Sequence, residues 1–261
     1  MSQTRRTFLV SAAAAAGGTM ILPYAALAEA HAGNMFSTDA GDITVHPLDH
    51  ASFVMETPKG TIYVDPVGDP ARYAEFPPAD LILITHEHGD HYNAETLTAL
   101  MGENTSLITN PAVHDMLPAD LASGAMTLAN GESHDWDGLG IDAIAAHNTT
   151  EDRMNFHPEG RDNGYVLSFE GFRVYISGDT EPTEDMLALE NIDVAFLCMN
   201  LPFTQTAEQA AEAVKTFKPA YVYPYHYRGR DGGTQDPEEF ASLVGDAAEV
   251  KLVDWYPNEE V

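Results

Sequence analysis

Short apolar runs separated by turn residues dominate the first half of the chain. The segments ITVHPL, SFVMET, TIYVDP and DLILITH have the length and composition of strands, with glycine, proline or aspartate between the first three. This spacing is typical of an antiparallel meander. Helical spacing from about Asn93 to Met101 and a proline-opened segment, PAVHDML, then predict two short helices, with a strand at SLITN between them.

The second half repeats this order of strands followed by helices. Strands are expected at LGIDAIAAH, GYVLSFE, FRVYISGD and VAFLCMN, the second and third forming a hairpin that turns at Glu170 and Gly171. Thr206 can cap a helix over TAEQAAEAVKTFK, and AYVYPYH, DPEEFASLVGDAAE and VKLVDW follow as strand, helix and closing strand. Two such rounds predict an α+β protein folded as a four-layer αβ/βα sandwich, with two sheets face to face and helices outside each.

The first residues have the composition of an export signal. A polar start carries Arg5 and Arg6, and an alanine-rich, weakly apolar run follows. TRRTFLV resembles a twin-arginine signal, although a retained anchor is the alternative. Glycines and a proline interrupt the run, which favours cleavage. We therefore expect a signal peptide at 1–28, a flexible mature N-terminus at 29–41, one folded domain at 42–261, and a periplasmic protein without stable membrane insertion.

The charge balance narrows the range of partners. Lysine and arginine total 12 against 41 acidic residues, a formal net charge of −29. Such a surface repels nucleic acid and anionic membranes, so we expect a small-molecule partner and leave self-association into a homo-oligomer open. The single cysteine, Cys198, lies in the apolar run DVAFLCMN. It can form no internal disulfide and is expected to be a buried strand residue.

The most informative stretch is LILITHEHGDHYNAETL. His86 and His88 alternate after a predicted strand, Gly89 permits a sharp turn, and Asp90 and His91 would begin the next helix. One segment can therefore direct two imidazoles at one metal ion and a carboxylate with an imidazole at a second. Zinc-type ions bind nitrogen and oxygen ligands at about 2.0–2.2 Å, which requires such dense placement.

The segment matches the HxHxDH motif of the metallo-β-lactamase superfamily, and the resemblance extends from about residue 42 to 254. It implies that Asp179 in YISGDT bridges two metals and that His226 in YPYHY is the last metal histidine. His147 in IAAHN falls where the third histidine of the first site is expected. Asp65 in TIYVDP is placed to orient a ligand histidine.

Within the superfamily, the chain looks most like the ascorbate-6-phosphate-lactonase-like branch. LDHASFVMET, HPEGRDNGYVL and GDT followed by MLALENIDVAFLCMN carry this resemblance. That branch often has Tyr-Asn where this chain has His147 and Asn148, so His157 in FHPEG is a rival third ligand. We favour His147, which ends a predicted strand. His50, near the implied mouth of the site, is a candidate for a catalytic or substrate-facing role, with a packing role as the alternative.

The resemblance implies hydrolysis with two divalent metal ions, zinc suiting the ligands best and manganese or iron also fitting. A metal-bridged hydroxide would attack an ester, lactone or phosphoester, and Asp90 could accept a proton. Arg153, Arg161 and Arg228 are rare bases near the ligand segments and could hold a carboxylate or phosphate. The alternatives are a β-lactamase-type amide hydrolase and a metal-binding protein of this fold without turnover.

Overall fold

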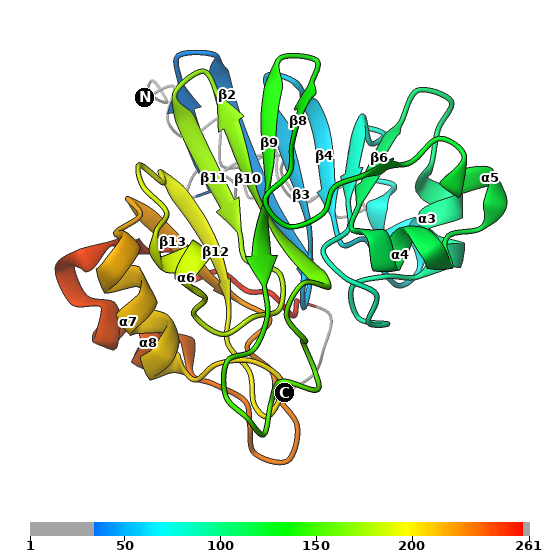
Figure 1. Ribbon diagram of the computed structural model, residues 1–261. Helices are drawn as coiled ribbons and strands as arrows, with labels where there is room; N and C mark the ends of the chain where they lie inside the picture. Colours follow the sequence, from blue (N-terminus) through cyan, green and yellow to red (C-terminus); the bar gives the residue numbers. More distant parts are fainter. Residues whose placement is uncertain (1–33, 258–261) are drawn as a thin grey trace, which may run out of the picture. The chain divides into compact units, whose positions relative to one another are not determined.

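The computed structural model describes residues 34–257, whose strands form two seven-stranded sheets (Figure 1). The first sheet contains β1 (Met35–Thr38), β2 (Gly41–Asp49), β3 (Ser52–Thr57), β4 (Gly60–Val64), β5 (Leu81–Leu83), β6 (Ser106–Thr109) and β7 (Met126–Thr127). The second contains β8 (Ser133–Trp136), β9 (Leu139–Ala146), β10 (Asp162–Phe169), β11 (Phe172–Ile176), β12 (Val194–Cys198), β13 (Tyr221–Tyr225) and β14 (Glu249–Val250). The predicted signal peptide lies outside the described residues.

The two sheets are built alike. In the first, β1 to β4 are antiparallel neighbours, and β5, β6 and β7 then add in parallel. In the second, β8 to β11 are antiparallel, and β12, β13 and β14 add in parallel. The hairpin predicted between β10 and β11 is present, with Phe169 opposite Phe172. Each half of the chain thus changes from hairpins to parallel crossovers. The two rounds of strands followed by helices were predicted, but the parallel pairing was not.

The helices lie between or after the parallel strands. They are α3 (Ala94–Leu100), α4 (Pro111–Met116), α5 (Ala119–Ala122), α6 (Glu184–Leu187), α7 (Ala207–Phe217) and α8 (Pro237–Val244), with 3₁₀ turns η1 (Pro70–Tyr73) and η2 (Gly245–Ala247). Thr206 and Gln209 form a capping box at the start of α7. Among the described residues, no helix is long and apolar enough to cross a membrane.

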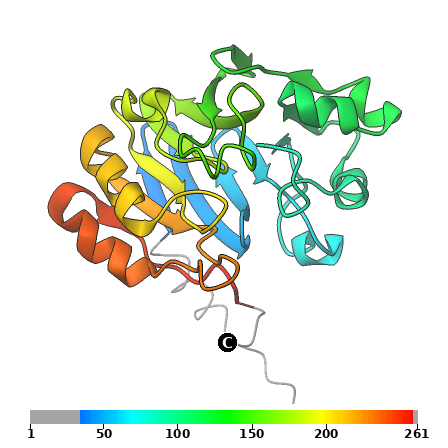
Figure 2. The same cartoon turned by 60° about the horizontal axis from the view of Figure 1, so that its bottom comes forward.

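Three apolar clusters define the layers. Phe53 and Leu83 of the first sheet pack with Tyr165 and Phe196 of the second in a cluster between the sheets. The alternate positions of the second sheet pack against α7 and α8, and those of the first sheet pack against α3 and α4. In Figures 1 and 2 these helix pairs cover the outer faces of the two sheets. The predicted four-layer αβ/βα sandwich is confirmed.

Several local predictions differ from the structure. The sheet begins at Met35 rather than at residue 42, because β1 pairs with β2 and buries Phe36. The expected closing strand is limited to β14, and Trp255 reaches the core from an irregular segment. Gly89 has no positive φ, and a β-carbon there would meet nothing within 4 Å, so its turn does not require glycine.

Polar residues follow the ends of the parallel strands. Asp65 comes directly after β4 and His86 soon after β5, while Asp179 and His226 follow β11 and β13. Carboxyl ends of parallel strands meet at one edge of a sheet, where ligands usually bind in such folds. The fold therefore collects the chemistry-bearing residues of both halves at one edge of the sandwich.

Candidate metal centre

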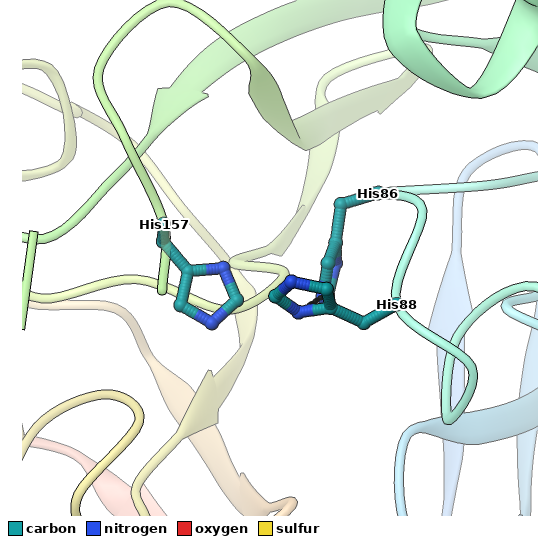
Figure 3. Close-up of side chains that lie close together, drawn as sticks. All are labelled: His86, His88 and His157. Atoms are coloured by element: carbon teal, nitrogen blue, oxygen red, sulfur yellow. Dashed lines mark hydrogen bonds between the residues drawn. The ribbon is translucent and has the colours of Figure 1, made fainter. Parts of the chain in front are cut away.

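A first group of possible ligands joins His86 and His88 with His157 (Figure 3). Nε2 of His86 lies 3.1 Å from Nδ1 of His88, and the ring of His157 is centred 5.0 and 4.9 Å from their rings. One ligand atom from each residue lies within 4.8 Å of the others. His157 comes from the loop between β9 and β10, so the structure unites the motif with the other half of the chain.

His157 is held by a buried carboxylate. Its Nδ1 lies 2.9 Å from Oδ2 of Asp162, and its Nε2 lies 3.5 Å from Oδ2 of Asp179. Arg161 donates to Asp162 and to the carbonyl of Phe156, and its Nη1 is 2.9 Å from Glu87. Arg161, expected from the sequence to bind substrate, is thus engaged in orienting the carboxylate that holds His157.

His147, favoured from the sequence, is in none of the groups of possible ligands among residues 34–257. Its backbone is held by the loop that follows β11. The N–H of His147 donates to Oγ1 of Thr180, and its carbonyl accepts from the N–H of Glu181. The preference for His147 is therefore corrected in favour of His157 as the neighbour of His86 and His88. The buried Nδ1 of His147 has no hydrogen-bond partner in the described part of the chain.

Beside the first group lie Asp90, His91 and His226, which belong to two further groups of possible ligands: Asp90 and His226 with His50, and His91 with His86 and Asp179. We refer to Asp90, His91 and His226 together as the second group. Nε2 of His226 lies 3.4 Å from Oδ2 of Asp90 and 3.5 Å from Oδ2 of Asp179. Nε2 of His91 lies 3.4 Å from Oδ1 of Asp179. Asp179 therefore contacts histidines of both groups. His50 is also here, its Nε2 3.5 Å from Asp90.

Buried partners fix the rings of the second group. Oδ2 of Asp65 lies 2.7 Å from Nδ1 of His91, and Asp65 also accepts from the N–H and hydroxyl of Thr85. The side-chain amide of Asn200 contacts Nδ1 of His226. Sequence analysis found Asp65 but missed Asn200 and Asp162. Asn200 could have been noticed, since it follows a buried strand at the same edge as Asp179.

Three buried atoms that face the centre have no hydrogen-bond partner within residues 34–257. They are Nε2 of His91, Nε2 of His226 and Oδ1 of Asp179. An unpaired buried polar atom is costly, and a cation can satisfy several of them at once. A tetrahedral ion with bonds of about 2.1 Å separates its ligand atoms by about 3.4 Å, close to the contacts just given. The donor set and its spacing fit divalent metal ions.

Neighbouring histidines oppose the effect of burial on the pKa values of the carboxylates in the cluster. Burial would raise the pKa of Asp179, but His226 and His91 outweigh it and hold the pKa well below its ordinary value. Burial would likewise raise the pKa of Asp90, yet contacts with His226 and His50 lower it. Burial lowers the pKa of His86, with His91 adding to the effect. Ionised carboxylates and a neutral His86 are the forms that bind metal. Burial would also lower the pKa of His91, but Asp179 and Asp65 outweigh it and raise that pKa well above its ordinary value.

The other two arginines singled out from the sequence lie in different environments. Nη1 of Arg153 is 2.6 Å from the buried carboxylate of Glu181 and also donates to the carbonyl of Thr204, so it holds loops together. Arg228 is two residues beyond His226 in the sequence. Its guanidinium lies 3.9 Å from the centre of the Tyr256 ring. Its position close to a candidate ligand keeps Arg228 a candidate for contacting an anionic substrate.

Comparison with known proteins identifies the family of the chain. The profile of a family described as a beta-lactamase superfamily domain matches residues 44–226. A UPF0173 metal-dependent hydrolase of Thermococcus kodakarensis is 34% identical over 228 residues, covering 84% of this chain and 99% of the relative. The chain therefore belongs to the metallo-β-lactamase superfamily and, within it, to the UPF0173 family of metal-dependent hydrolases.

Solved structures share the architecture. A Parabacteroides distasonis protein described as a metal-dependent hydrolase has 38% sequence identity and a TM-score of 0.74, with 83% of this chain and 96% of that chain covered. Igni18, a metallo hydrolase of Ignicoccus hospitalis, has 24% identity and a TM-score of 0.67, with 81% and 95% covered. At that identity, the second likeness supports the fold alone.

Proposed function

We propose that the protein is a binuclear metal-dependent hydrolase that cleaves an ester, lactone or phosphoester bond in a small molecule. The observation that carries the proposal is the sharing of Asp179 between two adjacent groups of ligands. Its Oδ2 lies 3.5 Å from both His157 and His226. In this proposal His86, His88 and His157 would hold the first ion and Asp90, His91 and His226 the second, with Asp179 as a ligand available to both.

When bound, such ions polarise a substrate oxygen and lower the pKa of a bound water to about 7. The protein's own contribution is to orient the ligands and control access. Asp65 and Asp162 hold His91 and His157 from behind, which limits the reorganisation on metal binding. The side chain of Asp90 is 47% exposed against 3% for Asp179, so a substrate arriving from solvent would meet Asp90 first.

The proposed substrate is small and carries a negative charge. Arg228 follows the ligand His226 closely and stacks on Tyr256, which fixes a positive charge in an otherwise acidic protein. The net charge of −29 disfavours nucleic acid as an alternative substrate. Zinc is the proposed metal, because the donors are mainly imidazoles.

The decisive experiment combines elemental analysis with turnover. The purified protein should hold two equivalents of metal and hydrolyse members of a panel of lactones, carboxylic esters and phosphoesters. His226→Ala should lose metal and turnover together, while His134→Ala, a half-exposed histidine on β8, should keep both. A protein that is fully metallated yet inert on the panel would instead support a metal-binding role. Preferential hydrolysis of an added β-lactam would support the amide-hydrolase alternative.

We further propose export to the periplasm through the twin-arginine route. The pair Arg5 and Arg6 followed by a weakly apolar run supports this proposal. A protein that crosses the membrane folded could bind its metals in the cytoplasm. Replacing both arginines with lysine should leave precursor in the cytoplasm, as fractionation and immunoblotting would detect. An unchanged periplasmic yield would contradict the twin-arginine assignment.

A further inference from the structure

His50 lies beside the second group of ligands but belongs to a distant part of the chain. It occupies the turn between β2 and β3, outside the histidine-rich motif. Its Nε2 is 3.5 Å from Oδ2 of Asp90, and its ring is centred 3.6 Å from that of His226. One ligand atom from each of these three residues lies within 4.8 Å of the others. The group therefore has the spacing of a metal site in its own right.

The backbone of His50 is fixed from two sides. Its N–H donates to the carbonyl of Trp255, and its carbonyl accepts from the N–H of His226. Its φ is 50°, in the left-handed region that side chains other than glycine rarely adopt, and His226 has a φ of 51°. Strained conformations of this kind persist where the surrounding structure holds them, and they are frequent at functional sites.

The imidazole is also held in one orientation. Nδ1 of His50 lies 2.8 Å from the hydroxyl of Tyr256, which in turn accepts from the N–H of Arg228. Metal-binding histidines usually donate their second ring N–H to such a partner, which leaves the other nitrogen available to the ion. This contact directs Nε2 of His50 towards Asp90. A histidine that only filled space would need neither the hydroxyl nor the strained backbone.

We propose that His50 is a further protein ligand of the second metal ion, alongside Asp90 and His226, and that Tyr256 positions it. The inference rests on the binuclear site proposed above and adds a donor that the motif does not contain. The second ion would then have more protein donors than the first. Retention of the second ion would then depend on the segment around Tyr256, near the end of the described residues.

Zinc titrations against a chromophoric chelator test this inference without relying on activity. In His50→Ala, the affinity for the second equivalent of Zn²⁺ should fall by more than about 100-fold. Loss of a residue that only hydrogen-bonds to a metal ligand typically costs about 10–100-fold. Tyr256→Phe keeps the ring and removes only the hydroxyl, so the second equivalent should weaken by about 10–100-fold. His134→Ala should match the wild type. With Co²⁺ as the probe, the visible absorption should change in His50→Ala, since the metal loses a donor.

The outcomes separate this inference from the proposed function. If the wild type binds two equivalents and His226→Ala loses one, but His50→Ala and Tyr256→Phe bind as the wild type does, His50 is not a ligand and the binuclear proposal stands. If the wild type binds fewer than two equivalents, the binuclear proposal itself fails. Circular dichroism shows whether His50→Ala folds. Should it not fold, Tyr256→Phe decides, because it retains the ring contacts.

Discussion

Oδ2 of Asp179 lies 3.5 Å from Nε2 of His157, although the two residues belong to different loops of the second sheet. The same oxygen lies 3.5 Å from Nε2 of His226 in the other group of ligands. Close approach of this loop is possible because Gly178, with a φ of 61°, precedes Asp179, and a β-carbon there would lie 2.7 Å from the carbonyl of Asn163. One carboxylate thus joins the two halves of the candidate centre.

Asp179→Asn should therefore reduce metal binding in both groups. The amide keeps the shape of the carboxylate but loses its charge and one of its two acceptor oxygens. We expect loss of most bound metal and a fall in kcat/KM of at least about 100-fold. Losing a metal ligand should cost more than losing a residue that only hydrogen-bonds to a ligand. Elemental analysis and kinetics would measure both. Asp185→Asn, an exposed carboxylate on α6, is the control, and equal metal content in the two variants would contradict the bridging role.

The two histidines that compete for the third position of the first site should behave differently. His157→Ala should lose one equivalent of metal, since it removes the imidazole beside His86 and His88. His147→Ala should keep both equivalents, and any effect should appear mainly in KM if the histidine contacts substrate. Equilibrium dialysis with Zn²⁺ followed by elemental analysis compares them directly. Metal loss in His147→Ala alone would restore the residue favoured by the sequence.

The preference for His147 shows that local sequence patterns do not predict which loop residues meet in the folded protein. His86, His88, Asp90 and His91 were predictable because one short segment brings them together. His157 lies in a loop without periodic pattern, and tertiary hydrogen bonds set the path of that loop. The N–H of Asn148 donates to the carbonyl of His157, so the loop doubles back on itself. The end of β9 and His157 therefore reach the same edge, and the sequence alone could not choose between the two histidines.

The larger architecture was predictable for a different reason. Alternating apolar runs and turn residues are local signals, and two rounds of them left few ways to bury every apolar face. Short edge elements such as β1 and β8 were missed, because their strand character depends on pairing with a neighbour. In the β8–β9 pair, for example, His134 lies opposite Ile141.

Asp65 should influence metal binding although it lies behind the ligands. Its Oδ2 is 2.7 Å from both Nδ1 of His91 and the hydroxyl of Thr85. In Asp65→Asn, one carboxylate oxygen is replaced by an NH₂ group, which donates and cannot accept. His91 would then lose the acceptor that fixes its orientation. We expect the affinity for the second Zn²⁺ to fall by about 10–100-fold. Chelator competition would measure it, and an unchanged affinity would show that His91 is oriented by other contacts.

Cys198 should be unreactive in the folded protein. Its side chain is fully buried, with Sγ 3.5 Å from the carbonyl of Thr180, and burial, together with Asp179, raises the pKa of the thiol to about 12. Alkylation requires both access and the thiolate, so iodoacetamide at a pH of about 8 should label the native protein very slowly. In denaturant the single cysteine should take up one equivalent, which mass spectrometry can count. Rapid labelling of the native protein would place the sulfur at the surface and contradict the packing of β12 beside the Asp179 loop.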